Sequence, residues 1–115
     1  MIYVYGIKKE PGKPPKEDSL PADILALEGY VGGIIEIDQI AAIAQYPQQQ
    51  IATSYLVLCD KDAKENGKPF CARINNRDYY GNIFIVRGTY FYNARLADVK
   101  ALFPSLWEEG ETNNE

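Results

Sequence analysis

The stretch that most constrains the fold is residues 82–92, where bulky side chains occupy both faces of an expected β-strand. One face carries Ile83, Ile85, Arg87, Thr89 and Phe91, and the other carries Phe84, Val86, Gly88, Tyr90 and Tyr92. Strands that are apolar on both sides are typical of the middle of a sheet that is covered on both faces. We therefore expect a central strand here, with Gly88 marking a bulge or the close approach of another backbone.

Earlier segments predict further strands. Residues 2–7, 34–38 and 51–59 are rich in apolar and β-branched side chains, which favour strands. Residues 8–19 are rich in Lys, Pro and Gly and predict a loop or mobile arm. Residues 40–45 are expected to continue the second of these strands past a bend, and a turn is expected at residues 47–50.

The alternation within residues 34–38 predicts which side chains face the core. Strand side chains point to opposite faces in turn. We expect Ile35 and Ile37 to be buried, with Glu36 and Asp38 facing outward.

Two helices are expected. In the first, Ser19 is the N-cap and Pro21 lies in the first turn. Its apolar face is formed by Leu20, Ile24, Leu27 and Val31, and the Gly32–Gly33 pair ends it. The second helix begins at Asn93, directs Leu96, Val99, Leu102 and Phe103 inward, and ends or kinks at Pro104.

Between the strands, Asn66–Gly67 is a turn signal, and residues 70–76 predict an irregular segment or a short helical turn. The whole pattern favours an α+β fold: a mostly antiparallel sheet of four to five strands with two helices packed on it. Residues 1–107 are expected to form one domain, and residues 108–115 an acidic, flexible tail.

Composition excludes several classes of function. The 115 residues include no histidine, so a Ser–His or Cys–His nucleophile cannot be built within the chain. Cys59 and Cys71 are expected to be reduced thiols, and no metal site or cofactor is expected. The loop that starts at Asp60 resembles a calcium loop, but Lys64 occupies a ligand position and Cys71 stands where a glutamate is needed. No apolar run reaches about 20 residues and no leader is evident, so we expect a cytoplasmic protein without a membrane segment.

Charge is distributed unevenly along the chain. Residues 66–97 carry a balance of +4, whereas the chain as a whole carries −4. This basic segment contains side chains suited to binding: arginine offers a planar fork for carboxylate or phosphate, and tyrosine offers a stacking face with a polar tip. The candidate binding residues are Arg73, Asn75, Asn76, Arg77, Tyr79 and Tyr80, with Arg87 in support. The alternative is a surface loop whose aromatic residues only cover the sheet edge.

A second, acidic candidate surface is formed by Glu36 and Asp38, expected on one strand face about 7 Å apart. These carboxylates, with the acidic tail, would mimic nucleic-acid phosphates and occupy a basic groove. They would also suit acid–base chemistry on a nucleotide or sugar, although polar-outward alternation predicts the same residues.

Several short motifs resemble the DUF3846 family. They are Val31-Gly-Gly-Ile-Ile-Glu36, Tyr55-Leu-Val-Leu-Cys-Asp60, Asn66-Gly-Lys-Pro69, Asn76-Arg77 and the segment 81–91, over about residues 20–103. In this chain Asn76-Arg77 stands further from Pro69 than the family pattern places it. The resemblance implies a small protein of a phage or mobile element, and such proteins often antagonise host defence.

The sequence and the resemblance together predict a non-enzymatic binding protein. It would inhibit a host defence protein, such as a CRISPR or restriction component, by stoichiometric binding. The alternatives are a sponge for an anionic nucleotide signal, a small enzyme that uses paired carboxylates, and a module that self-associates through a sheet edge. Direct nucleic-acid binding is not expected.

Overall fold

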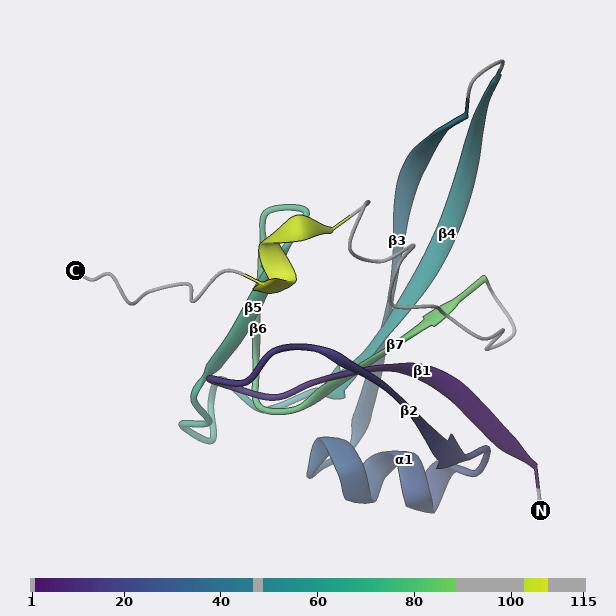
Figure 1. Cartoon of the computed structure of the whole chain (residues 1–115). Coiled ribbons are helices and arrows are strands. Elements are labelled where there is room, and N and C mark those ends of the chain that lie inside the picture. The colour runs from purple at the N-terminus through teal and green to yellow at the C-terminus, as the bar shows by residue number, and fades with distance from the viewer. Residues whose placement is uncertain (1, 47–48, 89–102, 108–115) are drawn as a thin grey trace.

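A computed structural model describes residues 2–46, 49–88 and 103–107 of the chain. Figure 1 shows its elements in chain order. They are β1 (Tyr3–Lys9), β2 (Lys16–Pro21), α1 (Ile24–Val31), β3 (Ile35–Tyr46), β4 (Gln49–Asp60), β5 (Phe70–Ile74), β6 (Arg77–Tyr80), β7 (Ile83–Arg87) and the 3-10 helix η1 (Pro104–Trp107).

Five strands form one antiparallel sheet in the order β2-β1-β7-β4-β3, and β5 and β6 form a separate two-stranded hairpin. The expected antiparallel α+β sheet and the central position of β7 are therefore confirmed. Among the described residues there is one α-helix, plus the 3-10 turn η1. The second expected helix, from Asn93, falls mostly on residues 89–102 and the acidic tail on residues 108–115, all outside the described residues.

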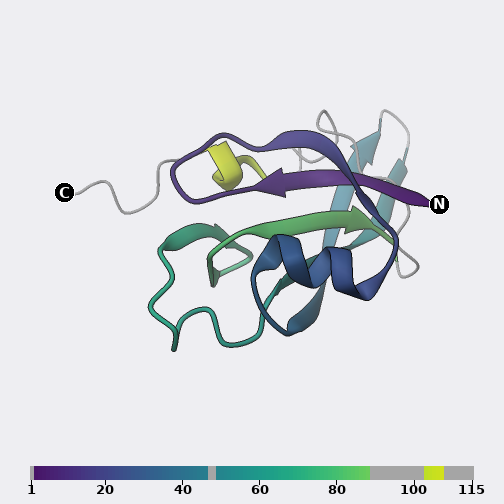
Figure 2. The same ribbon diagram turned by 90° about the horizontal axis from the view of Figure 1, so that it is seen from below.

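Each face of the sheet is covered by a different element. Helix α1 covers one face, as the view in Figure 2 shows. Its cluster comprises Val4, Leu27, Leu56, Leu58, Phe84 and Val86. The β5–β6 hairpin and η1 cover the other face with Cys71, Ala72, Ile74, Tyr79, Phe103 and Leu106. The bulky residues on both sides of β7 are buried because each face has its own cover.

The helix begins later than expected, and Ser19 is not its cap. Ser19 lies in β2, which pairs with β1, so part of the expected loop is an edge strand. The N-cap is Asp23, whose carboxylate accepts a hydrogen bond of 2.8 Å from the Ala26 amide. The C-terminal prediction is confirmed, since Gly32 takes the left-handed conformation (φ 85°) that a helix C-cap requires.

Two further expectations are wrong. Ile37 is 48% exposed instead of buried, because it lies at the outer edge of the α1 face. Residues 70–76 are also neither irregular nor helical, since β5 turns directly into β6. Asn75 and Asn76 have φ angles of 50° and 68°, and positive values at both central residues are those of a type I′ hairpin turn.

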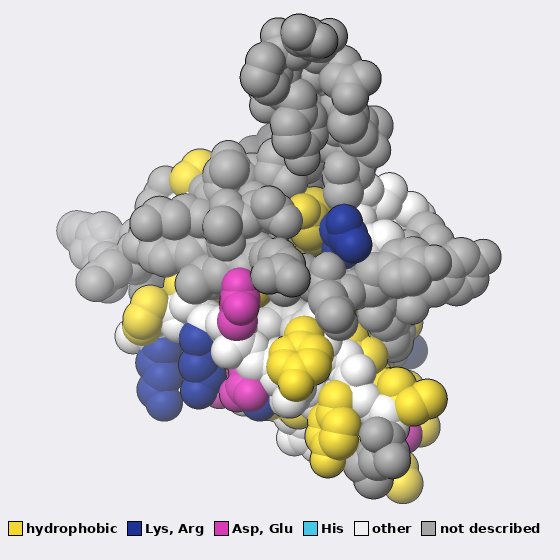
Figure 3. All heavy atoms as spheres, turned by 45° about the vertical axis from the view of Figure 1, so that its right-hand side comes forward, with side chains coloured by type: hydrophobic (Ala, Val, Ile, Leu, Met, Phe, Trp, Pro, Cys, Tyr) yellow, Lys and Arg dark blue, Asp and Glu magenta, His cyan; other side chains and the backbone are white. Residues whose placement is uncertain are grey.

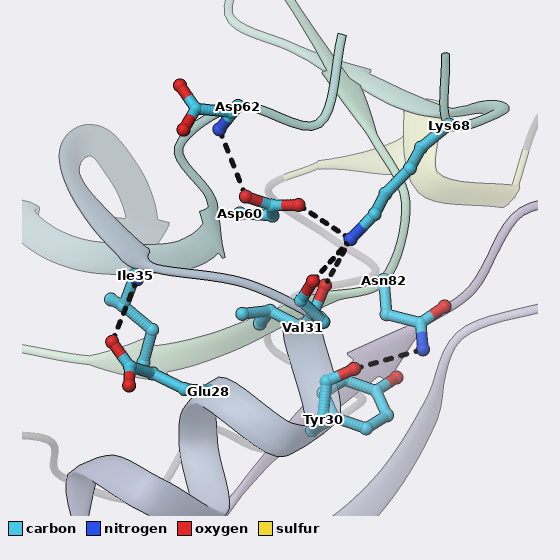
Figure 4. Close-up of polar contacts among 9 residues, drawn as sticks. Glu28, Tyr30, Val31, Ile35, Asp60, Asp62, Lys68 and Asn82 are labelled. Atoms are coloured by element: carbon cyan, nitrogen blue, oxygen red, sulfur yellow. Dashed lines mark hydrogen bonds and ion pairs between the residues drawn. The ribbon is translucent and has the colours of Figure 1, made fainter. Parts of the chain in front are cut away.

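A buried ion pair joins the end of β4 to the turn that follows it, as Figure 4 shows. The Asp60 side chain is 2% exposed, and its Oδ2 lies 2.6 Å from Nζ of Lys68. The Asp62 amide donates to Oδ1 at 3.0 Å, and the described residues supply no other donor to Oδ2. The same Lys68 ammonium donates to the carbonyls of Val31 and Gly32, at 3.2 and 2.8 Å, and so satisfies the C-terminal end of α1.

Asp60 is held in its ionised form by these contacts. Burial alone raises the pKa of this carboxyl group, but the Lys68 ammonium and the Asp62 amide outweigh burial, so the pKa of Asp60 lies below its ordinary value. The carboxylate also rests directly on the backbone of Gly33. A Cβ atom at that position would lie within 3.0 Å of three carboxylate atoms.

We expect Gly33→Ala to destabilise the fold by about 1–3 kcal/mol, because the added methyl group displaces the buried Asp60 carboxylate from Lys68. Urea unfolding measures the effect. Gly29→Ala is the matched control, because a Cβ there meets no atom within 4 Å and alanine favours the helix. Equal stability of the two variants would contradict this account.

We expect Asp60→Asn to lower stability at pH 7 by about 2 kcal/mol or more, because the Lys68 ammonium loses its anion. The folded pKa of Asp60 lies below its unfolded value of about 3.9, so its contribution is present above about pH 4 and is lost as the pH falls further. The variant should therefore lose stability less steeply than the native chain between about pH 4 and pH 2.

Thermal unfolding over this pH range measures that slope. Asp18→Asn is the control, because Asp18 is 42% exposed and its ion pair with Lys8 lies at the surface. A native-like slope in Asp60→Asn would show that this ion pair does not govern acid unfolding.

Candidate functional site

The β5–β6 hairpin presents most of the predicted binding residues. Its tight Asn75–Asn76 turn places Arg73 and Arg77 near one end, where both are exposed. Tyr79 is buried against the sheet (2% exposed), whereas Tyr80 is half-buried and stacks edge-to-face with Phe70 at 6.0 Å. The hairpin therefore offers arginine and asparagine to solvent but only one of its two tyrosines.

The structure brings the basic and acidic candidate surfaces together. Arg77 bridges two carboxylates of β3: its Nη2 donates to Oε1 of Glu36 at 3.1 Å, and its Nη1 contacts Oδ2 of Asp38. The Tyr79 hydroxyl donates to the same Asp38 oxygen at 2.9 Å. We call Glu36, Asp38, Arg77 and Tyr79 the carboxylate–arginine cluster.

Electrostatics fix the protonation states of Arg77 and Tyr79 in this cluster. Burial disfavours the guanidinium charge, but Asp38 and Glu36 outweigh burial and raise the pKa of Arg77. Burial, reinforced by the hydrogen bond to Asp38, also raises the pKa of Tyr79 above its ordinary value. The phenol therefore stays protonated as a donor, and the Arg77 guanidinium lies over its ring at 5.1 Å, a distance that suits a cation–π contact.

Arg73 is paired as well. Its Nε lies 2.7 Å from Oδ1 of Asp78, the residue opposite it in the hairpin. The hydrogen bond from Arg73 lowers the pKa of Asp78. This pair is more exposed than the cluster, since the Arg73 side chain is 63% exposed and Asp78 33%.

Arg87 is not part of this arrangement. It lies on β7, opposite Tyr55 of β4, and is exposed. Two hollows lie beside Arg77, a cavity next to β6 and a groove along β3, and Arg87 lines neither of them. The prediction that Arg87 supports the hairpin residues is therefore not matched by their positions.

Two hollows border Arg77. A cavity of about 230 Å³ lies between β6 and the turn after β4. Its lining includes the cations Lys61, Lys64 and Arg77 and the acids Glu36, Asp60, Glu65 and Asp78. An open groove of about 550 Å³ lies on the other side, along β3, and is lined by Ile37, Asp38, Gln39, Ile40, Ile74, Asn75, Arg77 and Tyr79.

Sequence reasoning missed Lys61, Lys64 and Glu65 as cavity residues. They belong to the loop that starts at Asp60, whose charged composition is also typical of a solvated turn, so no local pattern marks them as cavity residues. Exposed hydrophobic side chains also lie elsewhere, and on the face in Figure 3 several of them gather at the lower right, with most of the charged side chains to their left. The exposed hydrophobic side chains include Ile2, Tyr3, Tyr5, Ile24 and Leu25.

The chemistry available to the described side chains is limited. Burial raises the pKa of Cys59 and of Cys71 to about 12, so both thiols stay protonated and are poor nucleophiles at neutral pH. Residues 2–46, 49–88 and 103–107 contain no group of three or more His, Cys, Asp or Glu side chains placed to hold a metal ion. Within the same residues, no helix has the length and apolar character to cross a membrane.

Comparison of this chain with protein-family models, with curated proteins and with solved structures found no match. The resemblance to the DUF3846 family therefore stays a prediction, as does the setting that it implies.

We expect Arg77→Leu to destabilise the fold by about 1–2 kcal/mol, because Asp38, only 16% exposed, loses its cation. Chemical denaturation measures this change. Arg73→Leu is the matched control and should cost no more than about 0.5 kcal/mol, because its ion pair lies at the surface. A larger loss for Arg73→Leu would reverse the order of importance that we assign to the two pairs.

Proposed function

We propose that this protein acts by stoichiometric binding of a protein partner, and that the contact surface is the outer side of the β5–β6 hairpin. The observation that supports this proposal is that Arg73 and Arg77 are each held by carboxylates of the same chain. Arginine and tyrosine are enriched in the energetic centres of protein interfaces. Because both arginines are already oriented, little side-chain freedom is lost when a partner covers them.

The charge balance disfavours a small anionic ligand. The cavity beside Arg77 is lined by three cations and four acids, so a phosphate entering it meets carboxylates as well as cations. A nucleotide would have to displace Asp78 from Arg73, or Glu36 and Asp38 from Arg77. A protein surface that carries both charges can instead pair with these cations and carboxylates while their ion pairs stay in place. The nucleotide sponge is therefore the less favoured alternative.

The carboxylate–arginine cluster also argues for binding over acid–base catalysis. Asp38 is occupied by Arg77 and by the Tyr79 hydroxyl, and Glu36 by Arg77. Carboxylates that already pair with a guanidinium and a phenol of the same chain would have to give up these contacts before they could serve a substrate. Arg77 also neutralises one of the two charges by which Glu36 and Asp38 would mimic nucleic-acid phosphates, so this alternative is less favoured as well.

The class of partner rests on the resemblance alone. It implies a protein of a phage or mobile element, for which a host defence protein is the expected target. Inhibition by capture of a CRISPR or restriction component is the form of this function that we propose.

The test is capture from a lysate of the host, with mass spectrometry of the protein and small-molecule fractions, followed by calorimetry with the captured partner. We expect a fixed stoichiometry, and at least about a tenfold loss of affinity in the Arg73→Ala/Tyr80→Ala variant, since aromatic and arginine anchors dominate interfaces. Lys13→Ala is the control, because Lys13 is 71% exposed and lies outside the hairpin. Retention of full affinity by the hairpin variant, or capture of a nucleotide instead of a protein, would contradict the proposal.

A further inference from the structure

Within residues 2–46, 49–88 and 103–107, strand β3 is the outermost strand of the sheet and its outer edge carries no further strand. The order β2-β1-β7-β4-β3 leaves β3 paired with β4 alone, and in the part of the chain that the structure describes no strand lies on its other side. The edge strand β3 is twelve residues long. Together with β4 it projects beyond the rest of the described structure in Figure 1.

The hydrogen-bond pattern identifies the backbone groups that face outward. The Lys61 amide donates to the Ile34 carbonyl at 2.8 Å, so residue 34 faces β4. Alternate residues of an antiparallel edge strand bond to the neighbour, and the others point away from it. The odd-numbered residues of β3 therefore present their N–H and C=O groups to the outside. The first of these amides is already used, since the Ile35 N–H donates to Oε2 of Glu28 at 3.3 Å, and the next two belong to Ile37 and Gln39.

The opposite edge of the sheet, strand β2, is protected against pairing with another strand. The contrast with β3 therefore indicates which edge is available for pairing. Natural sheets blunt their edges with proline, with lysine or with side chains that occupy the outward groups. In β2, Pro21 has no N–H, and the Ser19 amide donates to its neighbour Asp18 at 2.8 Å. The sequence of β3, Ile-Glu-Ile-Asp-Gln-Ile-Ala-Ala-Ile-Ala-Gln-Tyr, contains no proline, glycine or lysine.

The two charged residues of β3 share one cation inside the molecule. Glu36 and Asp38 point to the face covered by the β5–β6 hairpin, where Arg77 pairs with both. One net negative charge therefore remains on this part of β3, and the register of an added strand must keep it away from a like charge. The open groove of about 550 Å³ runs beside this part of the edge and leaves room for the side chains of an added strand.

We propose that the occupant of this edge is β3 of a second copy of the chain, paired antiparallel about a two-fold axis at Ile40. Outward-facing residues must pair with outward-facing residues, so an odd-numbered residue lies opposite an odd-numbered one. With Ile40 on the axis, the acidic half of each strand lies opposite the alanine-rich half of its partner. The pairs in this register are Ile37 with Ile43, Asp38 with Ala42, and Glu36 with Ala44.

This register is self-complementary. It matches the exposed Ile37 with an isoleucine, and it keeps each carboxylate away from the carboxylates of the partner. A register centred on Asp38 would place two aspartates opposite each other, which is destabilising. The two five-stranded sheets then form one continuous sheet with both β5–β6 hairpins on the same side, because the axis is perpendicular to the sheet.

The test compares single proline substitutions at the two edges of the sheet. Gln39→Pro removes an outward N–H from β3 and leaves the bonds to β4 in place, whereas Ser19→Pro removes one from β2. Sedimentation equilibrium from about 1 to 300 μM should show a monomer–dimer equilibrium for the native chain and for Ser19→Pro. Gln39→Pro should raise the dimer Kd at least about tenfold, because each dimer loses two hydrogen bonds. Circular dichroism establishes that each variant is folded.

Amide hydrogen exchange gives a readout that does not depend on a variant. On concentration of the native chain, exchange at Ile37 and Gln39 should slow together with dimer formation, whereas Asp38 and Ile40 should be protected at every concentration because they face β4. A native chain that stays monomeric across the range overturns the proposal, and so does pairing of this edge only with a strand of another protein. The inference is independent of the proposed function, since dimerisation is measured on the purified chain without a partner.

Discussion

The Asp60–Lys68 ion pair is the contact on which the arrangement of the elements most depends. It connects the last residue of β4, the turn that follows, the C-terminus of α1 and the approach to β5 at a single ammonium group. Buried ion pairs contribute little net stability relative to apolar replacements, but a partner left without its counter-charge is costly. The pair therefore acts mainly as a constraint: other placements of α1 against the sheet would leave a buried charge uncompensated. The glycines at 32 and 33 are required because the ammonium and the carboxylate occupy the space of their missing side chains.

A similar logic explains why β3 departs from simple alternation. The sheet is covered on both faces, so neither set of side chains in β3 is solvent-facing by default. Its acidic side chains face the hairpin and are accepted there because Arg77 and Tyr79 supply a cation and a donor. Ile37, on the α1 face, extends past the area that the helix covers and remains half exposed. The polarity of a strand position thus follows from the element that lies over it.

Much of the sheet was predictable because its signals are local. The apolar residues on both sides of β7 gave its central position, and Gly32 and Asn66–Gly67 marked a helix end and a turn. The β5–β6 hairpin was also predictable in principle, because Asn-Asn between two strand-like segments is a signal for a type I′ turn. Strand β2 was not, because an edge strand made of Lys, Glu, Asp and Ser has the composition of a loop and is fixed only by pairing with β1. The pairing of Arg77 with Glu36 joins residues 41 positions apart, so no local pattern could show that the two candidate surfaces are one.

The position of Arg77 has a thermodynamic consequence. Its side chain, with that of Tyr79, forms a common wall between the cavity beside β6 and the groove along β3. A molecule bound on one side that shifted this guanidinium would reshape the opposite side, and occupancy of the two hollows would then be energetically coupled. Such coupling is reciprocal: each occupant would change the affinity of the other by the same factor.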